Sequence, residues 1–262
     1  MARRIVVTSG KGGVGKTTIC ALLGMKLADF GFRVVILDMD IGLNNLDVVM
    51  GVENEINFDI IDVIAGNCRL KQALVQDKKY PNLYVLASTH FYDDSSITKE
   101  DIKCVVDKLA ESFDYILLDC PAGVDEGFRR AVYSANEALV VVTPHISSVR
   151  DADKVLSILA GYDILSKGLI INRMRGDLMA TTETFEIEEI IRFLKTKLLG
   201  VVPENEEITK GYTAGDETSE ELARAITLLA ENMHNGTKKI YDCSRKYRGF
   251  WGVIRRNLKR RV

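Results

Sequence analysis

A run of glycines and lysines near the start of the chain has the spacing of a phosphate-binding loop. Residues Gly10 to Thr17 match the pattern G-x-x-x-x-G-K-[ST]. The mostly apolar residues 4–8 predict a short strand before the loop, and a helix is expected to begin near Lys16. In this context the glycines let successive backbone N–H groups turn inward around an anion, and the helix N-terminus adds unpaired donors. The pattern therefore predicts a site for the phosphates of a nucleotide.

The side chains of this loop suggest how a nucleotide is held. Lys16 is placed to reach the β and γ phosphates, and the Thr17 hydroxyl to take one position around Mg²⁺. The loop backbone supplies further donors, from Gly10, Gly12, Gly13, Val14 and Gly15. The loop also carries a second lysine, Lys11, which a single triphosphate does not require.

Acidic residues follow two other apolar segments that are expected to be strands. Asp38 and Asp40 come at the end of the segment that begins at Arg33, and Asp119 ends the segment that begins at Tyr115. In parallel α/β folds, ligands bind at the carboxyl ends of the strands. Mg²⁺ is usually bound through one or two carboxylates together with water and phosphate oxygens. The acids are therefore expected beside the glycine loop, although each also suits a strand-end turn.

We assign these acids separate roles. Asp119 is expected to order Mg²⁺, directly or through water, and Asp40 to orient the attacking water, since phosphoryl transfer is mostly positioning and charge stabilisation. Thr17, Asp40 and Asp119 together form the predicted metal site. Gly123, in the loop after Asp119, is predicted to present its N–H to the γ-phosphate, so that this loop distinguishes ATP from ADP.

Strand-like and helix-like segments alternate along the chain. Apolar strands are expected at 33–38, 83–87, 115–119, 138–143, 168–172 and 199–202, and helical patterns at 17–30, 59–75, from 98, 149–162, 186–198 and 217–232. Thr98 with Asp101 three residues later predicts a helix start. This alternation is typical of a three-layer α/β domain with a mainly parallel central sheet. We expect that ATPase domain to span residues 1–235.

The composition of the chain indicates the cellular compartment in which the protein is expected. The chain has 262 residues, 47% of them hydrophobic, which suffices for one full core. Five cysteines without C-x-x-C spacing argue against a disulfide framework or a structural zinc site and favour a reducing cytosol. No signal peptide is expected, and no apolar run is long enough to span a bilayer.

Charge is concentrated at the C-terminus. The net charge is −2, but residues 245–262 hold eight Lys or Arg and no acid, which leaves 27 basic and 37 acidic residues, a net −10, in the remainder. At about 100° per residue, one stripe of the terminal segment is apolar and the opposite face is basic, the pattern of an interfacial helix. The apolar stripe consists of Phe250, Trp251, Val253, Ile254 and Leu258. We therefore expect a linker at 236–246 and, at 247–262, an amphipathic membrane-targeting helix that forms on anionic lipid.

Two other interpretations of this tail remain. One is a basic arm that contacts nucleic acid, and the other is a helix docked on the body through Trp251. The arm does not account for an apolar stripe with the chain's only tryptophan.

The whole loop from Lys11 to Thr17, K-G-G-V-G-K-T, resembles the deviant Walker A ATPases. The resemblance implies that Lys11 crosses a dimer interface and that ATP lies between two subunits. The segments at 38–47, 119–123 and 147–151 sharpen it to the MinD family of septum-site-determining ATPases of bacteria and plastids. The likeness runs from residue 2 to the end of the chain.

Carried over position by position, this resemblance implies further site residues. Thr18 joins Lys16 and Thr17 at the phosphates and Mg²⁺, Asp40 is catalytic, and Asn45 faces the partner's nucleotide. The adenine contacts implied are Asn172 and Arg173 after one strand and Val202, Pro203 and Glu204 after another. The family also implies a MinC-like division inhibitor bound near 148–153, while the presence of a MinE-like activator stays open.

These expectations describe an ATPase that dimerises with ATP, binds the inner face of the cell membrane from the cytoplasm through its tail, and recruits a division inhibitor to control septum placement. Two alternatives are a flagellar-number ATPase of the FlhG type and a DNA-partitioning ATPase of the ParA type. A partitioning ATPase is expected to carry its basic residues on the folded body, whereas here the body is acidic, so no nucleic acid is expected. An iron–sulfur protein requires suitably paired cysteines, which the spacing does not show.

Overall fold

The strands form one eight-stranded sheet in the order β3-β4-β2-β5-β1-β6-β7-β8. The computed structural model describes residues 2–42, 45–88, 97–179, 186–205, 219–249 and 252. Neighbouring strands run parallel except for β3, which is antiparallel to β4. The strands are β1 (Arg3–Thr8), β2 (Val34–Asp38), β3 (Leu74–Gln76), β4 (Leu83–Leu86), β5 (Tyr115–Asp119), β6 (Glu137–Val142), β7 (Ser166–Met174) and β8 (Lys197–Pro203).

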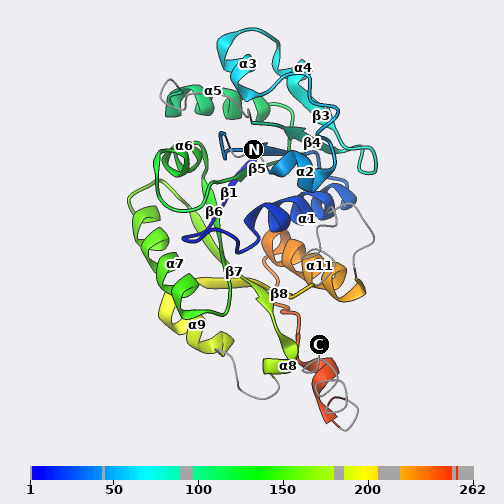
Figure 1. The fold of residues 1–262 in the computed structure, drawn as a ribbon, viewed down its shortest axis with the longest axis vertical. Helices are drawn as coiled ribbons and strands as arrows, with labels where there is room; N and C mark the ends of the chain where they lie inside the picture. Colours follow the sequence, from blue (N-terminus) through cyan, green and yellow to red (C-terminus); the bar gives the residue numbers. More distant parts are fainter. Residues whose placement is uncertain are drawn as a thin grey trace.

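Helices cover both faces of this sheet (Figure 1). Side chains of α1, α2 and α11 pack into the core on one face, and those of α3, α5, α6, α7 and α9 into the core on the other. The helices are α1 (Lys16–Asp29), α2 (Leu46–Met50), α3 (Ile60–Ala65), α4 (Leu70–Ala73), α5 (Lys99–Leu109), α6 (Glu126–Ser134), α7 (Ile146–Leu159), α8 (Gly176–Met179), α9 (Ile187–Leu194) and α11 (Glu220–Asn235), followed by the 3₁₀ turn η2 (Arg245–Tyr247). The predicted three-layer α/β fold is confirmed.

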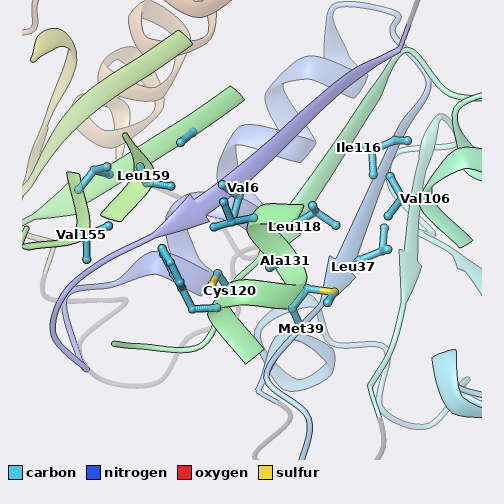
Figure 2. Packing of buried hydrophobic residues seen from close by; sticks show 14 of the residues in the cluster. Val6, Leu37, Met39, Val106, Ile116, Leu118, Cys120, Ala131, Val155 and Leu159 are labelled. Carbon is cyan, nitrogen blue, oxygen red and sulfur yellow. The ribbon is translucent and has the colours of Figure 1, made fainter. Parts of the chain in front are cut away.

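The central strands are apolar throughout because both of their faces are covered. Successive side chains of β1 point to opposite faces: Val6 belongs to one core, and Ile5 and Val7 belong to the other. Figure 2 shows the first of these cores, where Val6, Leu118 and Leu37 come from the sheet and Leu159 from α7. A continuous Val, Ile and Leu pattern therefore fixes these strands at the centre of the sheet.

Several element boundaries depart from the sequence prediction. The strand β3 and the helices α2 and α6 were not predicted. The helix expected to run to residue 198 ends at Leu194, because Lys195 adopts a left-handed φ of 50° and β8 begins at Lys197. The predicted start at Thr98 is confirmed, since its hydroxyl accepts from the Asp101 N–H at 3.1 Å.

The chain beyond α11 turns back onto the body. The side chain of the buried Asn232 donates to the Leu199 carbonyl at 2.8 Å and to the Lys239 carbonyl at 2.9 Å. Its carbonyl oxygen accepts from the Thr237 hydroxyl and the Lys239 N–H. One amide thus joins α11, β8 and the residues that follow. The predicted membrane residues Phe250, Trp251, Val253, Ile254 and Leu258 lie outside the described residues. Within the described chain, no helix combines the length and apolarity needed to cross a bilayer.

Replacing Asn232 by Ala is expected to lower the free energy of unfolding by about 2 kcal/mol, because it leaves the buried Leu199 carbonyl without its donor. Urea denaturation measures the change. The control is Asn235→Ala at the exposed end of the same helix, which should leave the midpoint within experimental error. Equal effects of the two substitutions would contradict this account of how the C-terminal segment is held.

Candidate functional site

Strand order brings the predicted acids to the glycine loop. β5 lies between β2 and β1, and in this register Asp119 is the partner of Asp38 on one side and of Val7 on the other. The glycine loop follows β1 at the same edge of the sheet, and its last residue, Gly15, caps the start of α1. The two acids and the loop therefore meet at the carboxyl ends of three adjacent strands, as predicted.

Close contacts from three other segments hold the glycine loop in place. A Cβ at Gly10 would overlap the backbone of Asp151 in α7. The Asn172 side chain at the end of β7 donates to the Val14 carbonyl at 2.8 Å. Gly13 and Gly15 have φ of 74° and 90°, a region that other residues rarely adopt, so these two turns need glycine.

Gly123 contributes the third of these contacts. Its N–H donates to the Ser9 carbonyl at 3.2 Å, and the Ser9 hydroxyl donates to the Lys11 carbonyl at 2.8 Å. The N–H predicted to meet the γ-phosphate therefore donates, in this structure, to the residue that directly precedes the loop. Gly123 has a φ of 93°, so only a glycine adopts this turn without strain.

The two loop lysines lie in different environments. Lys16 is buried, and its charge acts on the carboxyl groups of Asp40 and Asp119. Lys11 is exposed, and its ammonium donates to the Ser147 hydroxyl in the first turn of α7 at 3.3 Å. Lys16 thus points to the acids of its own chain, whereas Lys11 lies on the protein surface.

Asp119 sits in an environment that disfavours its charge. The pKa of Asp119 is raised to about 7, chiefly by burial and also by the nearby charge of Asp38, while a hydrogen bond from Thr17 lowers it in part. One carboxyl oxygen, Oδ1, is buried and has no hydrogen-bond partner among the described residues. An unsatisfied buried oxygen is costly, and a cation would satisfy it. Asp119 and Thr17 therefore fit the demands of a Mg²⁺ ion.

Asp38 organises the segment that follows β2. Its carboxyl oxygens accept from the Asp40 N–H at 2.9 Å and from the Leu46 N–H at 3.2 Å. Burial nevertheless raises the pKa of Asp38 to about 6. Asp38 therefore satisfies both interpretations that the sequence allowed for it, because it lies at the phosphate site and also forms a strand-end turn.

The two predicted residues of that segment differ in exposure. Asp40 is half-buried, and burial raises its pKa while the charge of Lys16 lowers it. Asn45 is exposed at the residue before α2. Asp40 therefore faces the lysine of the loop, and Asn45 is accessible at the surface.

A pocket of about 200 Å³ opens beside the loop, next to α1. It is lined by Gly15, Thr18, Ile19, Leu22, Asn172, Arg173, Val202, Pro203, Asn205 and Leu222. Four of the five residues expected to contact adenine line it, namely Asn172, Arg173, Val202 and Pro203. Glu204 does not line it; its backbone N–H donates to the Met174 carbonyl and its side chain pairs with Arg175 at 3.8 Å. The sequence did not indicate Asn205 or Leu222, because α11 and the end of β8 approach the loop only in the folded chain.

The cysteines show no paired arrangement among the described residues, and all five are free. Burial raises the pKa of the Cys120 thiol, which follows Asp119 directly. The described chain likewise contains no group of three or more His, Cys, Asp or Glu side chains placed to hold a metal. Cys120 thus behaves as a small buried apolar residue.

The fold and this site define a nucleotide-binding protein with a phosphate-binding loop. Residues 5–218 match the family model for the CobQ/CobB/MinD/ParA nucleotide binding domain. The septum site-determining protein MinD of Bacillus subtilis is 46% identical over 218 residues, which cover 82% of this chain and 81% of that protein. MinD of Helicobacter pylori is 40% identical over 266 residues, covering 97% and 98% of the two chains. The chain belongs to the MinD family of septum site-determining proteins.

Solved structures show the same fold. A MinC:MinD cell division complex of Aquifex aeolicus matches with a TM-score of 0.83 at 36% identity, covering 91% of this chain and 98% of that chain. MinD of Pyrococcus horikoshii complexed with Mg-ADP matches with a TM-score of 0.76 at 32% identity, covering 89% and 96%. A ParA family ATPase of Chlorobium tepidum, at 21% identity and a TM-score of 0.74, shares the fold.

The raised pKa of Asp119 predicts a pH-dependent stability. The folded state holds this proton up to about pH 7 while the unfolded chain releases it near pH 4, so stability falls as pH rises between these values. Asp119→Asn removes the charge and is expected to raise the free energy of unfolding at pH 8 by up to about 4 kcal/mol, since one pKa unit corresponds to about 1.4 kcal/mol. Urea denaturation of both proteins without nucleotide at pH 5 and pH 8 measures the difference, which should be larger at pH 8.

The control for this experiment is Asp101→Asn. Hydrogen bonds from Thr98 lower the pKa of Asp101, so this substitution is expected to destabilise the protein at pH 8. A stabilisation by Asp119→Asn that is the same at both pH values would contradict the assigned cause.

Proposed function

We propose that this protein is an ATP-hydrolysing switch that controls the placement of the division septum. The observation that carries the proposal is the meeting of a complete phosphate-binding loop with a buried carboxyl oxygen of Asp119 that has no hydrogen-bond partner among the described residues, in a chain of the MinD family. The reaction is hydrolysis of ATP to ADP and phosphate. A MinD of this family was solved with Mg-ADP, which supports the choice of nucleotide and ion.

Each part of the site has a role in this proposal. The N–H groups from Gly10 to Thr18 and the ammonium of Lys16 hold the phosphates. Thr17 and Asp119 hold Mg²⁺, which supplies charge stabilisation at the phosphate oxygens. Asp40, beside Lys16 and anchored through its N–H to Asp38, orients the attacking water.

The pocket next to α1 receives the base. The amide nitrogen of Asn172 donates to the Val14 carbonyl, which fixes the orientation of the amide, and its carbonyl oxygen is the atom that accepts from an exocyclic amino group of adenine. Pro203 and Leu222 supply apolar surface for the ring. Asn172 then links the base site to the phosphate loop through one side chain.

Dimerisation with ATP explains the second lysine. Lys11 is exposed, and among the described residues its ammonium is held by a single surface hydrogen bond to Ser147, so it can reach a nucleotide bound by a second subunit. Asn45 is also exposed, and it directly precedes Leu46, whose N–H donates to the Asp38 carboxylate. In the dimer we place both residues against the partner's nucleotide.

Membrane attachment is assigned to residues 247–262, as the charge pattern indicates. One short tail binds weakly because it must order itself on the lipid. Two tails in a dimer bind far more tightly, since the second insertion is intramolecular and raises avidity by roughly 10²–10⁴. The protein then cycles between cytoplasm and the inner face of the membrane, and hydrolysis releases it.

A MinC-like inhibitor is the proposed partner, supported by the MinC:MinD complex, and a MinE-like activator would act on the same cycle.

Sedimentation with anionic liposomes tests this switch. The wild type is expected to pellet with MgATP and to remain in solution with MgADP. Lys11→Ala should reduce pelleting in ATP to the ADP level, because the dimer no longer forms, whereas Lys71→Ala on the exposed face of α4 should pellet as the wild type does. ATP-dependent pelleting by Lys11→Ala would refute the dimer gate. Retention of DNA without any pelleting would favour the partitioning alternative.

Asp40 is predicted to act on hydrolysis and not on binding. Asp40→Asn should lower the turnover of ATP by about 100-fold or more, the range for loss of a positioned acid–base group, with little change in ATP affinity. The protein should then stay on liposomes long after wild-type protein has been released. Phosphate release and equilibrium nucleotide binding measure the two effects. Asp163→Asn, on an exposed loop after α7, is the control, and a parallel loss of ATP affinity in Asp40→Asn would contradict the role.

A further inference from the structure

The segment after α11 packs against the elements that end beside the base pocket. Asn232 fixes its first residues to β8, and the orange-to-red chain in Figure 1 then runs past β8 to α8. Cys243 and Tyr247 are buried, at 5% and 6% exposure. We refer to residues 237–247 as the C-terminal strap.

The strap touches the body at residues that follow or precede the walls of the pocket. A Cβ at Gly176, three residues after the wall residue Arg173, would overlap the carbonyl of Cys243. The Lys246 ammonium donates to the Glu221 carboxylate at 2.6 Å, and Glu221 directly precedes the wall residue Leu222. The strap is therefore one contact away from two walls of the pocket.

A third contact joins the two strands that frame the pocket. The Arg175 guanidinium donates to both carboxyl oxygens of Asp177, at 3.3 and 2.6 Å, and lies 3.8 Å from the Glu204 carboxylate. Glu204 follows the wall residue Pro203. Arg175 thus connects the chain after β7 to the chain after β8, and it directly precedes Gly176, which contacts the strap.

The contacts at Arg175 and Gly176 directly follow a residue with a strained backbone. Arg173 has a φ of 55°, which few residues other than glycine adopt. Such a conformation persists only where the surrounding structure holds it in place. Met174 pairs with Pro203 in the sheet, and the guanidinium of Arg175 bonds both carboxyl oxygens of Asp177. These contacts hold the residues after Arg173, and the packing of Gly176 on Cys243 holds the next turn.

We propose that Arg175 and the C-terminal strap are positioning elements of the base site, which hold Arg173 and the facing wall in the conformation that accepts a purine base. The inference rests on the proposed nucleotide site. Because binding linkage is reciprocal, a bound base in turn stabilises the docked strap. The origin of the membrane tail is thereby fixed next to the nucleotide.

Binding of ADP and of inorganic tripolyphosphate to the full chain separates the base site from the phosphate loop. ADP is used in place of ATP because ATP is expected to cause dimerisation, which would complicate the binding measurement. Arg175→Ala and Gly176→Ala are expected to weaken ADP binding by about fivefold or more, the usual lower range of such coupling, and to leave tripolyphosphate binding within twofold. Arg175→Lys should recover part of the ADP affinity. Gly161→Ala is the matched control, since its Cβ would make only an ordinary contact with the Ile158 carbonyl at 3.5 Å.

Trypsin cleavage of the wild type provides a second measurement that needs no variant. Cleavage after Lys238, Lys239, Arg245 or Lys246 should slow when ADP is added and should not slow with tripolyphosphate. Equal loss of ADP and tripolyphosphate binding in the variants would show a general structural role and overturn the inference, as would unchanged ADP binding or unchanged cleavage. Failure of the wild type to bind ADP at all would overturn the proposed function together with this inference.

Discussion

The burial of two carboxyl groups beside the phosphate loop is the constraint on which the site depends. Asp38 and Asp119 are partners in adjacent strands, and each would carry a charge away from water. Lys16 and two backbone N–H groups offset part of that cost, but one oxygen of Asp119 stays without a partner in the described chain. The site without ligand is therefore arranged to receive a cation, and the buried carboxyl groups lower the stability of the folded protein until one binds.

The rigidity of the loop comes from elements distant in sequence. α7 contacts it at Gly10, the segment after β5 at Ser9, and β7 through Asn172. Each of these elements also carries a surface or site of its own in the proposed cycle. A change at the proposed partner surface on α7 can therefore reach the phosphates through one layer of packed atoms, without a long pathway.

A small number of contacts also fixes the C-terminal part of the described chain. The strap closes back on the sheet through the buried amide of Asn232 and a glycine that has no room for a side chain. The proposed membrane tail then begins from a fixed point on the body. In this arrangement the proposed nucleotide site, the proposed partner surface and the proposed tail all depend on the carboxyl edge of one sheet.

The sequence by itself determined the α/β class, because strand and helix patterns alternate along the chain. It also determined the phosphate loop and the acids after the strands, because spacing within one short segment fixes each of these features. It did not determine the β3 edge strand, the end of α9 or the docked strap, since those depend on neighbours that arrive from elsewhere in the chain. Asn172 shows the same limit: its role in holding Val14 requires β7 and the loop to be side by side. Local pattern specifies which groups are present, and packing of distant segments decides which atoms of those groups remain available to a ligand.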